Sequence, residues 1–228
     1  MSDVYACARG REAQLCLGPD SGPVLLVAPA LFEEANRLRA FTVAIMRALA
    51  SHGVASVLPD LPGTNDSLIA TEDARLDDWQ DAFAAAVPAR RTYGFAIRGG
   101  ALVDARAALA GRYHLSPPTG ADIVRDLVRT RLAGVREGGA AFDPADIDRP
   151  GPPIELAGNA IARDLLSALK SAEPSQADRV ARLEGDGRPA DRVFAGRPLW
   201  RAAEPGTDQT LAAAVADDIA AWISRCEG

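Results

Sequence analysis

The sequence predicts an α/β fold in three layers: a mainly parallel, doubly wound sheet with helices on both faces. Short apolar runs alternate with longer stretches of helical periodicity, which is typical of βαβ units. Several runs are apolar without a break, as in residues 24–28 (VLLVA), which indicates strands buried on both sides. The chain has 228 residues and no evident linker or repeat, so we expect one domain over residues 1–228.

The predicted elements follow one another along the chain. Residues 4–9 and 13–17 alternate in polarity and predict an antiparallel pair at a sheet edge. Apolar runs predict further strands over 24–28, 54–58, 92–97, 112–115, 179–183 and 192–195. Helical periodicity and composition predict helices over 34–51, 77–87, 101–109, 122–135, 161–171 and 211–224. The Gly- and Pro-rich stretch 138–153 is expected to be a loop, too short to form a lid domain.

Composition and charge narrow the function classes. The net charge of −6 and the pI near 5.0 disfavour nucleic-acid binding, which needs a basic surface. No apolar run is long enough to span a bilayer, and residues 1–14 lack the apolar core of an export signal. The three cysteines have no metal-binding spacing, which favours reduced thiols in the cytoplasm. We therefore expect a cytoplasmic protein without metal or cofactor, and leave its oligomeric state open.

The most informative segment lies where the predicted strand 92–97 ends. Strand, tight turn and helix follow the pattern of a nucleophile elbow, G-x-S-x-G, in which small neighbours permit a strained turn. Here the five residues are Ala96-Ile97-Arg98-Gly99-Gly100, with arginine at the nucleophile position. A second register, starting at Gly94, places Ala96 there instead. Neither side chain can attack a carbonyl, because a guanidinium keeps its protons near neutral pH.

The partners of a serine nucleophile are also missing. A hydrolase of this type needs a histidine after the last strand, and residues 196–207 contain none. Of the two histidines, we interpret His52 as a helix-capping or surface residue and His114 as a half-buried strand residue. The alternative is an esterase-like hydrolase or acyltransferase that uses Ser116 with His114, since residues two apart on a strand share a face.

Several segments together resemble a known family. They are residues 28–37 (APALFEEANR), 58–67 (LPDLPGTNDS), 97–102 (IRGGAL), 118–120 (PTG) with Arg125, Leu127, Arg129 and Arg131, 154–158 (IELAG), and 196–200 (GRPLW) with Glu204. As an ordered set they resemble the α/β-hydrolase-like proteins associated with exosortase systems. The second subfamily fits best, because it also places arginine at the elbow. The sequence departs at Thr64-Asn65, where a glycine-rich turn is typical, which concerns loop geometry only.

The resemblance implies an α/β-hydrolase fold in a bacterial cytoplasmic protein linked to the production of exported surface polysaccharide. Fold does not establish function. The ligand implied is a small anionic or acyl- or sugar-containing molecule, or a protein partner in polysaccharide assembly. We expect a pseudo-hydrolase that lacks the serine-histidine triad and binds this ligand, and the alternative remains an active enzyme that uses Ser116 with His114.

A buried arginine at the elbow needs a counter-charge. We expect Arg98 to be clamped by Glu34 or Glu204, in one version as a bidentate pair. Either this pair closes a former active site, or Arg98 and Arg37 bind a phosphate or carboxylate. Asn36 is alternatively a helix N-cap, and Trp200 a packing residue. The candidate ligand pocket comprises Arg98, Glu33, Glu34, Asn36, Arg37, Gly99, Trp200 and Glu204.

Overall fold

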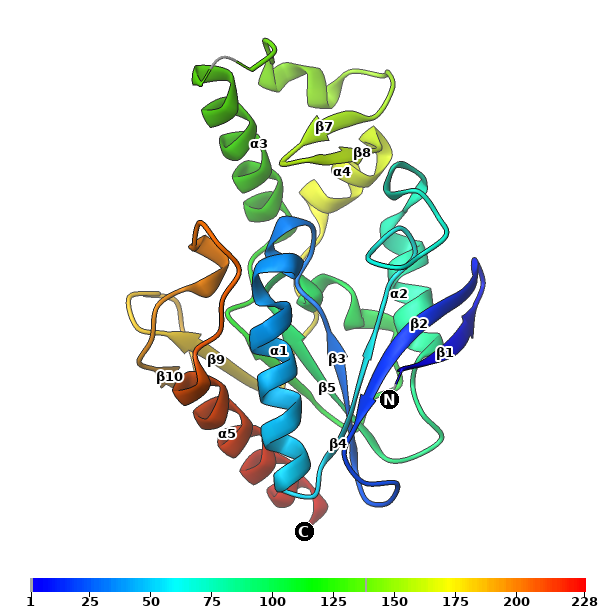
Figure 1. Ribbon diagram of the computed structural model, residues 1–228, viewed down its shortest axis with the longest axis vertical. Coiled ribbons are helices and arrows are strands. Elements are labelled where there is room, and N and C mark those ends of the chain that lie inside the picture. The colour runs from blue at the N-terminus through cyan, green and yellow to red at the C-terminus, as the bar shows by residue number, and fades with distance from the viewer. Residues whose placement is uncertain (1, 138) are drawn as a thin grey trace.

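The computed structural model describes residues 2–137 and 139–228, and within them the main sheet has eight strands (Figure 1). Their order is β1-β2-β4-β3-β5-β6-β9-β10. At one edge of the sheet, β2 is antiparallel to both of its neighbours, β1 and β4, and the six strands from β4 to β10 run parallel to one another. The bounds are β1 Ser2–Cys7, β2 Gly10–Leu17, β3 Val24–Ala28, β4 Ala55–Pro59, β5 Thr92–Ile97, β6 Arg112–Leu115, β9 Arg179–Leu183 and β10 Arg192–Phe194. The predicted fold class is confirmed.

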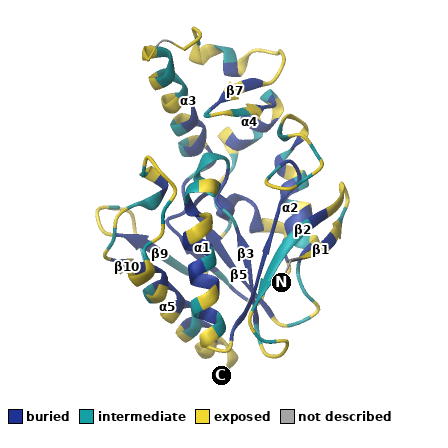
Figure 2. Cartoon of the chain, in the orientation of Figure 1, coloured by how far each residue is buried: buried dark blue, intermediate teal, exposed yellow. Residues whose placement is uncertain are grey.

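Alternation along β3 shows how the two faces of the sheet are covered. Leu25 and Val27 pack into one core with helices α1 (Glu33–Ser51) and α5 (Gln209–Glu227). Val24, Leu26 and Ala28 pack into a second core on the opposite face. The helices of this second core are α2 Leu76–Ala85, α3 Gly120–Arg136 and α4 Arg163–Ser171. Both cores are deeply buried, and exposed residues follow the outer sides of the helices (Figure 2).

The chain between β6 and β9 extends beyond the carboxyl ends of the strands, at the top of Figure 1. It contains α3, a short 3₁₀ helix (Pro144–Asp148), the hairpin β7–β8 and α4. The hairpin strands are Ile154–Leu156 and Asn159–Ile161. The apolar side chains of the hairpin belong to the same core as β3, so residues 120–171 are packed onto the sheet. No helix in the described part of the chain is long and apolar enough to cross a bilayer.

Three local expectations are corrected. The helix expected at 101–109 is instead two 3₁₀ turns, Arg98–Leu102 and Asp104–Arg106, because paired glycines disfavour a helix and the Asp104 carboxylate binds elsewhere in the core. The helix expected from 161 begins at Arg163, after the unpredicted hairpin.

The segment expected to be a loop, 138–153, contains the 3₁₀ helix 144–148. The Asp143 side chain caps this helix, and Pro144 is its first residue. Gly138 lies outside the described residues.

Gly100 sits where the chain after β5 presses on the end of β3. A Cβ atom at Gly100 would lie 2.3 Å from the carbonyl oxygen of Ala28, which is backbone and cannot move aside cheaply. Gly100→Ala should therefore lower the free energy of unfolding by roughly 2 kcal/mol or more. Gly134→Ala is the control, since a Cβ there meets nothing within 4 Å and alanine favours a helix. Urea unfolding of both variants checks this, and an equal effect would contradict it.

Candidate functional site

The turn after β5 has the geometry of a nucleophile elbow. Arg98 follows the last strand residue directly, with φ of 52°, in the left-handed region that side chains other than glycine rarely adopt. Gly99 lies against Leu31 and Ile123, which leaves no room for a side chain. The small residues predicted around Arg98 thus permit a backbone that costs about 1–3 kcal/mol in strain.

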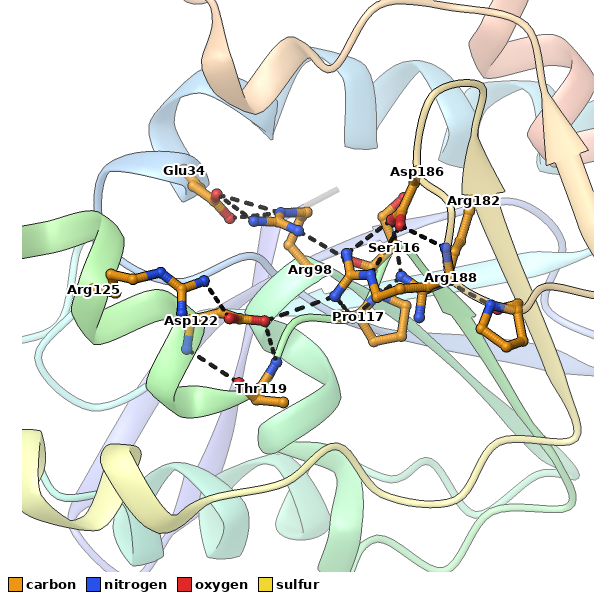
Figure 3. Close-up of polar contacts among 11 residues, drawn as sticks. Glu34, Arg98, Ser116, Pro117, Thr119, Asp122, Arg125, Arg182, Asp186 and Arg188 are labelled. Atoms are coloured by element: carbon orange, nitrogen blue, oxygen red, sulfur yellow. Dashed lines mark hydrogen bonds and ion pairs between the residues drawn. The ribbon is translucent and has the colours of Figure 1, made fainter. Parts of the chain in front are cut away.

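The guanidinium of Arg98 is buried and held on several sides (Figure 3). Its Nε and Nη2 donate to the carboxylate of Glu34 at 3.1 and 2.9 Å, and Nη1 donates to the Ser116 carbonyl at 3.0 Å. The ring of Trp200 lies 4.6 Å from the guanidinium carbon. The expected pair of Arg98 with Glu34 is confirmed, and it is bidentate. Glu204, the other expected partner, is exposed and forms no ion pair with Arg98 in the described structure.

Glu34 reaches Arg98 from the first turn of α1. This helix begins at Glu33 after Phe32, so Asn36 lies inside it and the N-cap interpretation of Asn36 is wrong. The reason is that Phe32, with φ of 55°, turns the chain into the helix four residues before Asn36. Burial raises the pKa of Glu34 above its usual value, and the charge of Arg98 offsets part of that rise.

The loop after β10 closes over the elbow with Trp200 in place of a histidine. Trp200 lies on a short 3₁₀ helix, Leu199–Arg201, and is 9% exposed. Arg37 fixes this turn, because its Nη1 donates to the Trp200 carbonyl at 3.0 Å while Nη2 pairs with Glu33. Arg37 therefore positions the loop that packs against Arg98.

Ser116 and His114 are not joined by a hydrogen bond in the described structure. His114 is 1% exposed, so the expectation of a half-buried residue is wrong; the cause is that residues after the elbow and after α4 cover it. Its Nε2 lies 2.9 Å from Asp104 Oδ2 and 3.5 Å from Ser175 Oγ, and Ser175 Oγ also donates to Asp104. A relay needs acid and nucleophile on opposite ring nitrogens, so this Asp-His-Ser group does not have relay geometry.

Several other side chains lie at the surface or in the core. His52 is the C-cap residue of α1 and contacts Asp217 at the surface, as expected. Trp79 and Trp222 are buried packing residues. On α3, Arg125 and Arg129 pair with aspartates three residues earlier, which agrees with a solvated helix face.

A second arginine network beside the elbow was not predicted. Asp186, in the loop after β9, accepts hydrogen bonds from Arg188 and Arg182, and both arginines reach the Pro117 carbonyl (Figure 3). These contacts, chiefly the one with Arg188, hold the pKa of Asp186 well below its ordinary value. The sequence contains Asp186-Gly187-Arg188, but only the fold brings Arg182 and Pro117 to the same place.

Two cavities adjoin the Arg98–Glu34 pair. The first, of about 260 Å³, lies between α1, α3 and the Trp200 turn; we call it the elbow pocket. Its lining is Leu31, Phe32, Glu33, Glu34, Arg37, Ile123, Asp126, Leu127, Arg129, Thr130, Trp200 and Arg201. The second, of about 320 Å³, borders Arg98, Ser116 and the loop after β9. No group of three metal-binding side chains occurs among residues 2–137 and 139–228.

No protein-family model and no curated protein matches this sequence. Solved structures do match it. Est1E from Butyrivibrio proteoclasticus, with ferulic acid bound, is 16% identical over 97% of this chain and 99% of that chain, with a TM-score of 0.67. DcsB, in complex with its substrate analogue, is 13% identical over 99% and 98%, with a TM-score of 0.60. The α/β hydrolase GrgF from Penicillium sp. sh18 is 15% identical over 80% and 78%, with a TM-score of 0.52.

The chain has the α/β-hydrolase fold. In this α/β-hydrolase fold the nucleophile position is filled by Arg98, and the loop that carries histidine in a serine hydrolase carries Trp200. Identities this low show the fold alone.

Removing both members of the buried pair should cost less than the sum of the costs of removing each alone. Glu34→Gln should lower the free energy of unfolding by about 1–3 kcal/mol, since it leaves Arg98 without its counter-charge. In R98M/E34Q no such charge remains, so the double variant should cost less than the sum of the single variants. Urea unfolding measures the cycle. Glu33→Gln is the control, with a more exposed partner and an expected change below about 1 kcal/mol; strict additivity would contradict the assignment.

Acid should weaken the fold through Asp186. Its folded-state pKa lies below the unfolded value of about 3.9, so its stabilising contribution is complete above about pH 4 and is lost as pH falls further. Asp186→Asn should flatten part of the decline in urea midpoint between about pH 5 and pH 2. Exposed Asp20, changed to Asn, is the matched control. Identical pH profiles for wild type and both variants would refute the role of Asp186.

Proposed function

We propose that this protein is a non-hydrolytic member of the exosortase-associated type that binds a small anionic ligand with an acyl or sugar-containing body through the elbow pocket. The observation that carries the proposal is the guanidinium of Arg98 in the nucleophile position, bound to Glu34 and to the Ser116 carbonyl. A permanent cation held in this way neither attacks a carbonyl nor accepts a proton.

The surrounding residues support binding without turnover. The loop after the last strand supplies Trp200, which stacks on Arg98, and residues 196–207 contain no histidine. The alternative pair, Ser116 with His114, lacks a hydrogen bond between its members in the described structure, and the Nε2 atom of His114 faces Asp104 instead. We therefore favour a protein that binds its ligand and does not transform it.

The lining of the elbow pocket indicates the kind of ligand. Four residues give the pocket apolar walls: Leu31, Phe32, Ile123 and Leu127. Its carboxylates are paired with arginines, as Asp126 is with Arg129, and Arg201 is a lining cation without an ion pair in the described structure. Apolar walls with a few polar groups suit an acyl or aromatic body that carries one anionic end. Est1E, of the same fold, was solved with ferulic acid, so ferulate and a medium-chain fatty acid are suitable first probes.

The proposed setting is the assembly of exported polysaccharide, where the ligand is a metabolite, a lipid-linked sugar intermediate or a surface of a partner protein. Support comes from the ordered resemblance of the sequence segments, including arginine at the elbow.

The first experiment separates binding from turnover. A fluorophosphonate serine probe, read by mass spectrometry, should label no serine, and short and long esters should not be hydrolysed. Arg98→Ser should not create activity, since residues 196–207 provide no histidine. Labelling of one serine, with turnover lost when it is changed, would refute the proposal in favour of a hydrolase.

Ligand binding is tested by filling the pocket. Ferulate or octanoate should raise the Tm of wild type, by linkage, and should fail to do so for Thr130→Trp, whose new side chain occupies the elbow pocket. Ala121→Trp, at an exposed position on the opposite side of the same helix, is the control and should respond like wild type. An unchanged response in Thr130→Trp would place the ligand elsewhere.

A further inference from the structure

A second cavity lies beside the elbow, bordered by the loop that follows β9. Its volume of about 320 Å³ is at the lower end of small-molecule pockets and equals the space of roughly ten water molecules. Its lining is Arg98, Ser116, Leu183, Glu184, Gly185, Asp186, Gly187, Arg188, Pro198, Trp200 and Arg201. It shares only Trp200 and Arg201 with the elbow pocket.

Three groups at this cavity have unused hydrogen-bonding capacity. Ser116 is fully buried, and its hydroxyl has no partner within the described residues. Three of the five N–H groups of Arg98 are engaged, which leaves two without a protein acceptor. Arg201, within the same described residues, has no ion pair and no side-chain hydrogen bond. A buried hydroxyl without a partner costs about 1–3 kcal/mol, which a ligand oxygen would recover.

The charges around the cavity select for a monoanion. Arg98 pairs with Glu34, and Arg188 pairs with Asp186, which leaves Arg201 and Glu184 as the charged lining residues without an ion pair in the described structure. Asp186 is saturated by Arg182 and Arg188, so it repels an incoming anion only weakly. A polyanion would meet Glu184, which is exposed and has no ion pair in the described structure.

Glu184 also favours a ligand that carries hydroxyl groups. An ionised carboxylate only accepts hydrogen bonds, so its favourable partner in a ligand is a hydroxyl group. The cavity therefore combines donors for one carboxylate, on Ser116, Arg98 and Arg201, with an acceptor for hydroxyls on the opposite loop.

We propose that this cavity is a binding site for a small hydroxylated monocarboxylate, such as a sugar acid. Its carboxylate accepts hydrogen bonds from the Ser116 hydroxyl and from the free N–H groups of Arg98 and Arg201. Its hydroxyls donate to Glu184. The site does not require the elbow pocket to be occupied, and it holds whether or not the protein hydrolyses anything.

Titration with glucuronate, followed by amide NMR shifts, tests the site. We expect saturable shifts in residues 184–188 and around Ser116, with little change in residues 123–130 of the elbow pocket. Arg201→Gln should weaken glucuronate binding by about tenfold or more, and Ser116→Ala by about two- to tenfold, as expected for a charged and a neutral hydrogen bond. No saturable binding, or shifts elsewhere, overturns the proposal.

Matched variants and probes give the experiment its specificity. Arg197→Gln makes the same charge change four residues from Arg201, outside the cavity, and should bind glucuronate as wild type does. Glucose, which lacks the charge, should not bind measurably. Glu184→Ala should weaken glucuronate but not propionate, which has no hydroxyl. Equal losses of glucuronate affinity in the Arg201 and Arg197 variants would mean that only the overall charge of the protein matters, and would refute the site.

Discussion

Arg98 is a permanent charge placed where the sheet, the first helix and the last loop meet. A charge in such a position is tolerated only when its hydrogen bonds and its counter-charge are supplied from nearby. Glu34 supplies the charge from the first turn of α1, the carbonyl of Ser116 accepts from the end of β6, and Trp200 covers the guanidinium from the last loop. Three elements far apart in the sequence are therefore fixed to one side chain. The 3₁₀ turn that carries Trp200 is in turn held by a hydrogen bond from Arg37.

Arginine also organises the neighbouring strand ends. Consecutive carbonyls at Ser116 and Pro117 accept from different arginines, Arg98 on one side and Arg182 with Arg188 on the other. Ser116 has φ of 49°, so a residue in the left-handed region separates β6 from α3. The guanidiniums bind the carbonyls of this connection, while the Ser116 hydroxyl has no partner among the described residues. The unpaired hydroxyl of Ser116 thus lies between the two arginine networks, at the carboxyl edge of the sheet.

Much of the fold and of the elbow could be predicted from the sequence. Unbroken apolar runs predicted the strands, and the small residues around Arg98 predicted the elbow, because both follow from local backbone requirements. The pair of Arg98 with Glu34 was predictable from electrostatics, since parallel strand ends meet at one edge. The hairpin β7–β8, the burial of His114 and the Asp186 network were not. Each depends on contacts between distant segments, as when Asp104 and Ser175 enclose His114, and no local pattern encodes such contacts.

The left-handed backbone at Arg98 has an evolutionary consequence. A serine hydrolase accepts strain at this residue because the strain exposes its nucleophile. Here the same strained backbone carries an arginine, which exposes no nucleophile. The close contact of Gly100 with Ala28 and the contacts of the guanidinium keep the backbone in this conformation. Changes at positions 98 and 34 are therefore linked. Serine at position 98 would leave the Glu34 carboxylate partly buried without its counter-charge, so the substitution would lower stability unless Glu34 changed as well.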